Sequence, residues 1–176
     1  EVYDEEIAVR GARSVTVRVT VTGHGPVVAG DPRRGKAIAL RYTATSGPNR
    51  GFEAVHAMLR ARSAGELDES MRSWVDPGNN FVFADVHGET GYRTRGRVPI
   101  RPRANGWLPV PGWTGEYEWE GFVPFEEMPH ARNPETGFLG TANNRIVGPE
   151  YPYYLGVDYA AGFRALRLHE LLAELK

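Results

Sequence analysis

A proline-rich stretch from Pro99 to Pro134 is the feature that most constrains how this chain can fold. Prolines stand at positions 99, 102, 109, 111, 124, 129 and 134. Each internal proline removes a backbone donor and clashes with the preceding helical turn, so a continuous helix is excluded there. We therefore expect an extended, well-packed excursion in which Trp107, Trp113 and Trp119 are buried anchors.

The residues at the start of the chain predict strands over 1–45. Residues 13–22 read RSVTVRVTVT, in which valine alternates with polar residues. This period of two is typical of a half-buried strand, and it turns four valines to one inward face: Val15, Val17, Val19 and Val21. Residues 24–26 (HGP) break the pattern, and another short strand is expected over 37–43.

The periodicity then changes to that of helices, which predicts a short helical hairpin over 51–76. Phe52, Val55 and Leu59 fall near helical spacing, and a second set follows at i, i+4 and i+7: Leu67, Met71 and Trp74. Ser63, with Glu66 three residues later, forms a capping box that predicts the start of the second helix.

A strand- and turn-rich region is expected over 79–145. Within it, residues 80–98 read as a β-hairpin that turns at His87–Gly88, with the return strand beginning at Tyr92. A last helix is expected over 162–176, with four apolar residues on or near one face: Phe163, Leu166, Leu171 and Leu175. The predicted fold class is α+β, with strands in the majority, in a single partial domain over 1–176.

Composition excludes several classes of partner and site. The 176 residues suffice for one compact domain or two small lobes. Their net charge of −1 gives no long-range attraction to nucleic acid or an anionic membrane. No window approaches the roughly 18 apolar residues of a membrane-spanning helix. Cysteine is absent, which excludes a disulfide, a thiolate zinc site and a thiol nucleophile. We expect neither a nucleic-acid nor a membrane partner.

Asn143 and Asn144 are the candidate residues for chemistry. An asparagine side chain is a neutral donor and acceptor, and in a dry pocket its NH₂ group can stabilise an oxyanion without adding a competing charge. By their residue types alone, the two asparagines are more consistent with a simple turn after a strand that ends at Ala142 than with a catalytic role. Arg164 lies near the start of the last helix, where the helix dipole slightly disfavours a cation.

Histidines and carboxylates give no comparable signal. The five histidines (His24, His56, His87, His130 and His169) show no metal spacing, and no Gly-x-Ser-x-Gly elbow supports a Ser-His-Asp triad. Five acidic residues could supply calcium ligands, because Ca²⁺ takes six to eight oxygens: Asp85, Glu116, Glu118, Glu126 and Glu127. No metal ligand is assigned, and the metal site stays unknown.

A series of short motifs carries a family resemblance that covers almost the whole chain. In order they are HGP (24–26), NFVFAD (80–85), GY (91–92), LPVPGW (108–113), GEYEW (115–119), VPFEE (123–127), NP (133–134), TANNR (141–145) and GFR (162–164). In order and spacing the chain resembles the penicillin acylase family of N-terminal nucleophile hydrolases, which includes the acyl-homoserine lactone acylases. The resemblance implies a segment from within the β subunit of such an enzyme.

The resemblance implies roles for two residues. In that family an asparagine of a short Asn-Asn motif contributes its side-chain amide to the oxyanion hole, and Asn143 matches it, with Asn144 structural. An arginine about two dozen residues later holds that asparagine in place. Arg164 lies 21 residues after Asn143 and takes that role, with Arg167 as the fallback. No cofactor is implied for catalysis, although a structural calcium is implied for the full enzyme in many members.

The same resemblance implies what this chain lacks and what surrounds it. The family nucleophile is a serine at the start of the β subunit, whereas this chain begins with Glu1. We expect the parent protein to hydrolyse a linear amide that links an acyl chain to a β-lactam nucleus, homoserine lactone or another amine. We expect the chain alone to be inactive. Its implied partners are the rest of the β subunit, the α subunit and the acyl amide substrate, in the periplasm or outside the cell.

An alternative of another class stays open, namely a non-catalytic binding or packing module that shares the acylase fold. The absence of a complete nucleophile system and the Trp- and Tyr-rich middle of the chain support it, because aromatic side chains can grip a ligand or partner. In an excised segment, apolar surfaces would lie open, so we also predict self-association into dimers or larger species.

Overall fold

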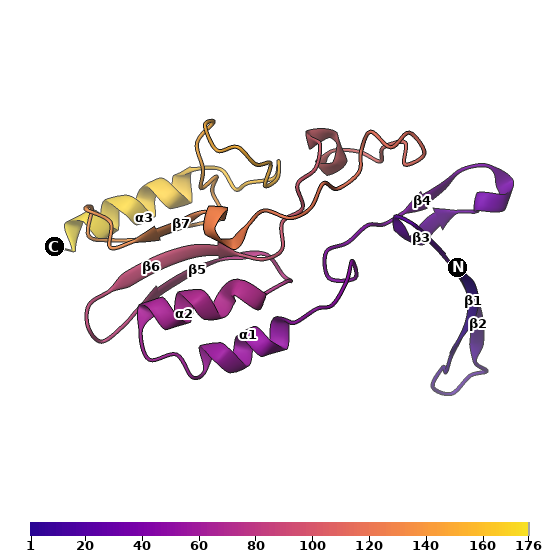
Figure 1. Ribbon diagram of the computed structural model, residues 1–176, viewed down its shortest axis with the longest axis horizontal. Helices are drawn as coiled ribbons and strands as arrows, with labels where there is room; N and C mark the ends of the chain where they lie inside the picture. Colours follow the sequence, from indigo (N-terminus) through magenta and orange to yellow (C-terminus); the bar gives the residue numbers. More distant parts are fainter. Residues whose placement is uncertain (176) are drawn as a thin grey trace. The chain divides into compact units, whose positions relative to one another are not determined.

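The computed structural model describes residues 1–175 and has the predicted mixed α+β character, with two antiparallel sheets and three α-helices in that range (Figure 1). The chain divides into two compact units, Glu1–Pro48 and Asn49–Lys176. The assignment of residues 1–176 to one partial domain stays a prediction. Among the residues the structure describes, the helices are too short and too polar to cross a membrane.

The first unit is a four-stranded antiparallel sheet in the order β1-β2-β3-β4. Its strands are β1 (Val2–Ile7), β2 (Val15–Thr22), β3 (Gly25–Gly30) and β4 (Ala37–Ala39). The predicted strand over 13–22 is thus present from Val15, and the one expected over 37–43 is shorter. Between β3 and β4, the Asp31 carboxylate accepts a hydrogen bond from the Arg33 N–H at 2.9 Å and caps a 3₁₀ turn over Pro32–Arg34.

The inward valine face of β2 is not borne out. Val15 and Val17 are 51% and 41% exposed, and Val19 and Val21 are only half-buried. Alternation specifies two faces of a strand, but burial also needs a second layer over one of them. Within this unit the described elements are strands and one 3₁₀ turn, and no helix covers the sheet.

In the second unit, the predicted helical hairpin is α1 (Gly51–Met58) followed by α2 (Ala64–Ser70), with a 3₁₀ turn over Met71–Ser73. Ser63 caps α2 as expected, because its Oγ accepts from the Glu66 N–H at 3.2 Å. The Glu66 carboxylate reaches back one residue further than in a capping box and accepts from the Arg62 N–H at 2.7 Å.

A three-stranded antiparallel sheet forms the middle of this unit, in the order β5-β6-β7. It consists of β5 (Asn79–Ala84), β6 (Thr90–Arg95) and β7 (His130–Arg132), so the return strand begins two residues before the predicted Tyr92. The Asp85 carboxylate closes the β5–β6 turn by accepting from the N–H groups of His87 at 2.9 Å and Glu89 at 3.1 Å. It also accepts from the Ala64 N–H at 3.0 Å, which joins the turn to the start of α2.

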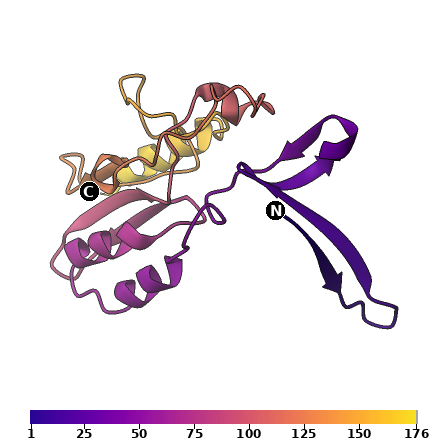
Figure 2. The same ribbon diagram turned by 45° about the vertical axis from the view of Figure 1, so that its right-hand side comes forward.

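Helices lie on both sides of this sheet, with α1 and α2 against one face and α3 (Phe163–Glu174) on the other side (Figures 1 and 2). The core lies on the α1–α2 side, where Phe83 packs with Ala64 and Met71. The β6 residue Arg93 is buried in the same layer. Its Nη2 donates to the Asp68 carboxylate of α2 at 2.7 Å, and its Nη1 donates to the Phe125 carbonyl at 2.8 Å.

The proline-rich stretch contains no α-helix among the described residues, as predicted; it holds only 3₁₀ turns over Arg103–Gly106 and Phe125–Glu127. The expectation of three buried tryptophans is wrong for two of them, since Trp107 and Trp113 are 68% and 81% exposed. Trp119 is half-buried and meets the Phe122 ring edge-on at 6.0 Å between centroids. Proline excludes a helix, but it does not specify which other segment packs against an irregular stretch. The Trp107 and Trp113 rings therefore stay on the surface.

The predicted C-terminal helix is α3, and Lys176 of the predicted range lies outside the described residues. The four apolar residues that were placed on or near one face of this helix are all exposed: Phe163, Leu166, Leu171 and Leu175. The stripe that turns inward is instead Ala165, Leu168 and Leu172, which follow the i, i+3, i+7 spacing of one helix face.

Candidate functional site: an asparagine held by α3

Asn143 lies in an unusual backbone conformation in a loop of the irregular segment between β7 and α3. Its φ is +62°, in the left-handed region that non-glycine residues rarely adopt and that asparagine tolerates better than most. The Asn143 carbonyl accepts a hydrogen bond from the Ala160 N–H at 2.8 Å, which fixes the backbone in this conformation. Asn143 is exposed in this conformation.

Arg164, in the first turn of α3, holds this loop through one nitrogen. Its Nη2 donates to the Asn143 Oδ1 at 3.0 Å and to the Ala142 carbonyl at 2.9 Å. Because the oxygen of the amide faces the guanidinium, the NH₂ group of Asn143, on the other branch of the planar amide, points away from Arg164 and is left to donate. The structure thus brings together the two residues that the sequence selected as site residues.

The neighbours of Asn143 have different tasks. Asn144 is tied to the backbone, since its Oδ1 accepts from the Ala142 N–H at 3.0 Å and its Nδ2 donates to the Arg145 carbonyl at 2.9 Å. This is the structural part expected for it. Arg167, the fallback for Arg164, pairs instead with Glu170 on its own helix at 2.9 Å.

The chain approaches α3 closely just before the loop. A Cβ on Gly140 would lie 2.9 Å from Leu168 Cδ2 and 3.1 Å from Leu172 Cδ1, so an alanine there would require the ends of these two side chains to shift. The Gly140 carbonyl also lies 3.2 Å from the His169 Nε2. The loop and the helix that carries Arg164 are therefore one packed piece.

A group of three residues on the β5–β6 hairpin contacts the same loop, and none of the three was predicted as a site residue. Asn80, Tyr92 and Thr94 form a hydrogen-bonded group, and the Asn80 Nδ2 donates to the Thr141 Oγ1 at 3.2 Å. The period-two pattern could have placed Tyr92 and Thr94 on one face of the return strand. It holds no signal for Thr141, which lies 61 residues beyond Asn80.

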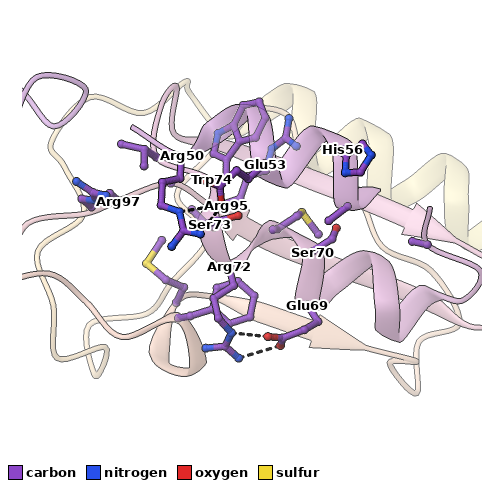
Figure 3. A pocket seen from close by; sticks show the side chains of 18 of the residues that line it. Arg50, Glu53, His56, Glu69, Ser70, Arg72, Ser73, Trp74, Arg95 and Arg97 are labelled. Carbon is purple, nitrogen blue, oxygen red and sulfur yellow. Dashed lines mark hydrogen bonds and ion pairs between the residues drawn. The ribbon is translucent and has the colours of Figure 1, made fainter. Parts of the chain in front are cut away.

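A hollow of about 960 Å³ opens elsewhere in this unit, between α1, the turn after α2 and the end of β6 (Figure 3). Its rim is rich in arginine, but the guanidinium groups drawn there are engaged. Arg50 pairs with Glu53 at 2.5 Å, and Arg72 with Glu69 at 2.8 Å. Arg95 stacks on the Trp74 ring at 3.8 Å, and burial lowers its pKa below the ordinary value. Neither Asn143 nor Arg164 lines this hollow.

The acidic residues considered as calcium ligands do not converge in the part of the chain that the structure describes. The Asp85 carboxylate serves three backbone N–H groups, of which that of Ala64 does most to hold its pKa below the ordinary value. Hydrogen bonding to Arg72 lowers the pKa of Glu126, and the Glu127 carboxylate accepts from the Tyr153 hydroxyl. Over residues 1–175 no three His, Asp or Glu side chains gather in a way that could hold a metal ion.

Tyr151 and Tyr153 lie beside Glu127. Desolvation, reinforced by the charge of Glu127 and by Tyr153, raises the pKa of Tyr151 to about 12, and the Tyr151 hydroxyl donates to the Glu127 carbonyl at 2.8 Å. The Tyr151 and Tyr153 rings meet edge-on at 5.8 Å between centroids, so the pair packs this turn.

Comparison with known proteins gives a consistent family. The sequence model of the family described as penicillin amidase matches residues 1–176. The chain is 43% identical over 168 residues to the penicillin acylase 2 proenzyme of Pseudomonas sp. (strain SE83), covering 96% of the chain and 22% of that protein. It is 32% identical over 174 residues to the acyl-homoserine lactone acylase QuiP of Pseudomonas fluorescens, covering 97% of the chain and 21% of that protein.

A solved structure agrees with the sequence comparisons. The thermostable penicillin G acylase from Alcaligenes faecalis superposes with a TM-score of 0.81 at 27% identity, over 100% of this chain and 31% of that one. The chain thus spans about a fifth of the length of the curated relatives it matches. With the family model matched from end to end, the chain belongs to the penicillin amidase family.

Proposed function

We propose that this chain is part of the β subunit of a linear-amide hydrolase, in which Asn143 supplies a hydrogen bond to the oxyanion of the acyl-transfer step. The parent reaction is hydrolysis of an amide between an acyl chain and an amine such as a β-lactam nucleus or homoserine lactone. The names of the relatives, penicillin acylase and acyl-homoserine lactone acylase, support both substrate classes.

The proposed chemistry begins with a serine that lies outside this chain. Its hydroxyl attacks the amide carbonyl, with its own α-amino group as the base through a water molecule. The oxyanion that forms accepts hydrogen bonds from the Asn143 NH₂ and from a backbone N–H elsewhere in the parent protein. The amine leaves, and water hydrolyses the acyl-enzyme.

The observation that carries the proposal is the pair of hydrogen bonds from Arg164 to Asn143 Oδ1 and Ala142 O, at 3.0 and 2.9 Å. An oxyanion donor must be held before charge develops, because it then needs no reorganisation during the reaction. Arg164 fills the acceptor side of the amide and leaves the NH₂ group to donate. It also favours this side-chain orientation over one rotated by half a turn, which would set the NH₂ group against a guanidinium.

The test compares two replacements of Asn143 in the full-length processed protein that carries this segment. Glycine tolerates the φ of +62° and removes the amide, whereas alanine would add backbone strain and is a poorer probe. Aspartate keeps the size and the bond from Arg164 but cannot donate. We expect both variants to lower kcat about 100- to 1000-fold, as for removal of one oxyanion donor.

The matched control is an arginine pair on one helix. Arg164→Met should lower kcat because Asn143 loses its fixed orientation, whereas Arg167→Met changes an exposed arginine that pairs only with Glu170. Folding is checked by circular dichroism for all four variants. Full activity in Asn143→Gly would overturn the assignment of Asn143, and equal effects of the two arginine variants would remove the orienting role of Arg164.

The chain of 176 residues by itself is proposed to be inactive and to self-associate. The first property is proposed because the serine nucleophile of the proposed reaction lies outside this chain. The second is proposed because apolar rings such as that of Phe52, which is 91% exposed, lie open. Amide hydrolysis by the purified chain that disappears in Asn143→Gly would contradict the first. A strictly monomeric sedimentation profile at high concentration would contradict the second.

A non-catalytic binding or packing module with this fold is the second candidate. The exposure of Trp107 and Trp113 favours it, because aromatic side chains on an irregular segment can grip a ligand or a partner. Activity of the full-length protein that depends on Asn143 would decide for the hydrolase. An inert full-length protein whose tryptophan fluorescence responds to acyl amides would decide for the module.

A further inference from the structure

One face of the β5–β6 hairpin carries a group of polar side chains that the proposed reaction does not use. Asn80 on β5 lies opposite Thr94 on β6 in the antiparallel register. Tyr92 lies two residues from Thr94, so its side chain is on the same face of the strand. The other face, with Phe83 and Arg93, belongs to the core and its buried ion pair.

The side-chain amide of Asn80 has a fixed orientation. The Tyr92 hydroxyl donates to the Asn80 Oδ1 at 2.6 Å, and the Thr94 hydroxyl lies 3.1 Å from the same oxygen and 2.7 Å from that of Tyr92. Two hydroxyl groups on the oxygen side leave the NH₂ group of Asn80 to point the other way. Burial raises the pKa of Tyr92, so its hydroxyl stays protonated and able to donate at neutral pH.

The NH₂ group of Asn80 meets the loop of Asn143. It donates to the Thr141 Oγ1 at 3.2 Å, across 61 residues of sequence, and all four side chains are half-buried. Thr141 stands two residues before Asn143. The loop is thus held at Thr141 from the sheet and at Ala142 and Asn143 from α3 through Arg164.

We propose that Asn80 is a positioning residue for Asn143 that acts through Thr141. The proposal rests on the function proposed above for Asn143. Arg164 fixes the rotation of the Asn143 amide, but α3 could shift together with the loop that it holds. The hydrogen bond from Asn80 holds the loop against the sheet. It thereby sets the distance between the Asn143 NH₂ group and a substrate bound by the rest of the protein. Misplacement of a reacting group by about 1 Å can cost on the order of 100-fold in rate.

The test removes the hydrogen bond between Asn80 and Thr141 by changing either its donor or its acceptor. It is carried out in the full-length processed protein with an acyl amide substrate. Thr141→Val has nearly the shape of threonine and removes the acceptor, whereas Thr141→Ser keeps the hydroxyl and is the matched control. Asn80→Asp keeps the acceptor for Tyr92 and loses the donor. We expect Thr141→Val and Asn80→Asp each to lower kcat about 10- to 100-fold with KM unchanged. Thr141→Ser should stay within about threefold of the parent.

A second comparison separates positioning from a loss of stability. In an Asn143→Gly background the amide to be positioned is gone, so Thr141→Val should lower kcat no further, although any effect on the unfolding midpoint would remain. The double variant of Asn80 and Thr141 should be no worse than the more affected single variant. Equal kcat for Thr141→Val and Thr141→Ser would overturn the positioning role. So would a further loss from Thr141→Val in the Asn143→Gly background.

The outcome distinguishes this inference from the function beneath it. If Asn143→Gly keeps full activity, the proposed function fails, and the positioning role fails with it. If Asn143→Gly loses activity while Thr141→Val does not, only the positioning role fails. Loss in both, with rescue by Thr141→Ser, supports the two proposals together.

Discussion

The two faces of the β5–β6 hairpin are built from different chemistry. The face toward α1 and α2 packs Phe83 against Met71 and buries Arg93 against Asp68. The opposite face carries Asn80 and its two hydroxyl partners, and reaches the Asn143 loop. Apolar packing is non-directional, whereas a chain of hydrogen bonds fixes angles and donor directions.

This difference indicates a division of labour within one sheet. The α1–α2 face supplies most of the buried apolar surface, so changes there should alter the free energy of unfolding. The polar face buries less apolar surface and should contribute less to the free energy of unfolding. Changes there should instead shift the loop that carries Asn143. Three substitutions can break or sharpen this contrast.

The largest effect on stability is expected from Asp68→Ala on the α1–α2 face. The side chains of Arg93 and Asp68 are 5% and 23% exposed, so the substitution leaves a buried guanidinium without its carboxylate. Breaking a buried pair on one side typically costs about 3–5 kcal/mol of unfolding free energy. Urea unfolding of the variant measures it.

The neighbouring residue provides the control. Glu69→Ala removes a carboxylate that pairs with Arg72, but these side chains are 61% and 46% exposed, and such a pair contributes about 0–1 kcal/mol. Equal losses in the two variants would show that Arg93 is not in a dry environment. Restoration of stability in Asp68→Leu combined with Arg93→Met would locate the cost in the unpaired charge.

A smaller effect is expected from Gly140→Ala on the opposite side of the sheet. The new methyl group would meet the ends of Leu168 and Leu172, which can give way, so we expect a loss near the lower end of the range for overpacking, about 1 kcal/mol. Activity should fall more than stability suggests, because α3 carries Arg164. Gly156→Ala is the control, since its Cβ would meet nothing within 4 Å. A drop in stability with unchanged kcat would contradict a coupling between α3 and the site.

The smallest effect is expected from Tyr92 and confined to alkaline pH. Its pKa is raised by burial in the folded state, so folding favours the neutral phenol. This contribution is complete below the pKa of an unfolded tyrosine, about 10, and is lost as the pH rises through the higher folded value. Tyr92→Phe should therefore flatten the fall of unfolding free energy as the pH rises above about 10. An unchanged dependence of unfolding free energy on pH would show that the Tyr92 hydroxyl is exposed to solvent.

Much of the fold and the central pair of the site could be predicted from the sequence, for reasons that individual residues show. Ser63 and Glu66 mark the start of α2 because a helix N-terminus needs acceptors for its free N–H groups. The family motifs selected Asn143 and Arg164 at a separation of 21 residues, and the structure places a hydrogen bond between them. Local chemistry and motif spacing were sufficient for these.

The wrong predictions of burial and the missed contact share one physical cause. A residue's type and its local sequence do not specify which distant segment packs against it. Trp107 and Trp113 have large aromatic side chains like those of a core, yet both rings are exposed. Val15 and Val17 alternate correctly on a strand that has no helix over it in its own unit. Asn80 was missed for the same reason, since its partner Thr141 is distant in sequence.

Asp85 has a consequence for how the second unit assembles. Its carboxylate serves the β5–β6 turn and the first N–H of α2 at once, so the hairpin and the helix share one acceptor group. The hairpin satisfies its own turn N–H groups through this carboxylate, but the first N–H of α2 finds the acceptor only when the two elements have docked. The separation of 21 residues between Ala64 and Asp85 makes this docking a short-range event, with a modest loop-closure cost. Folding of this unit should then begin with α2 and the hairpin together, and Asp85→Ala should slow refolding rather than speed unfolding.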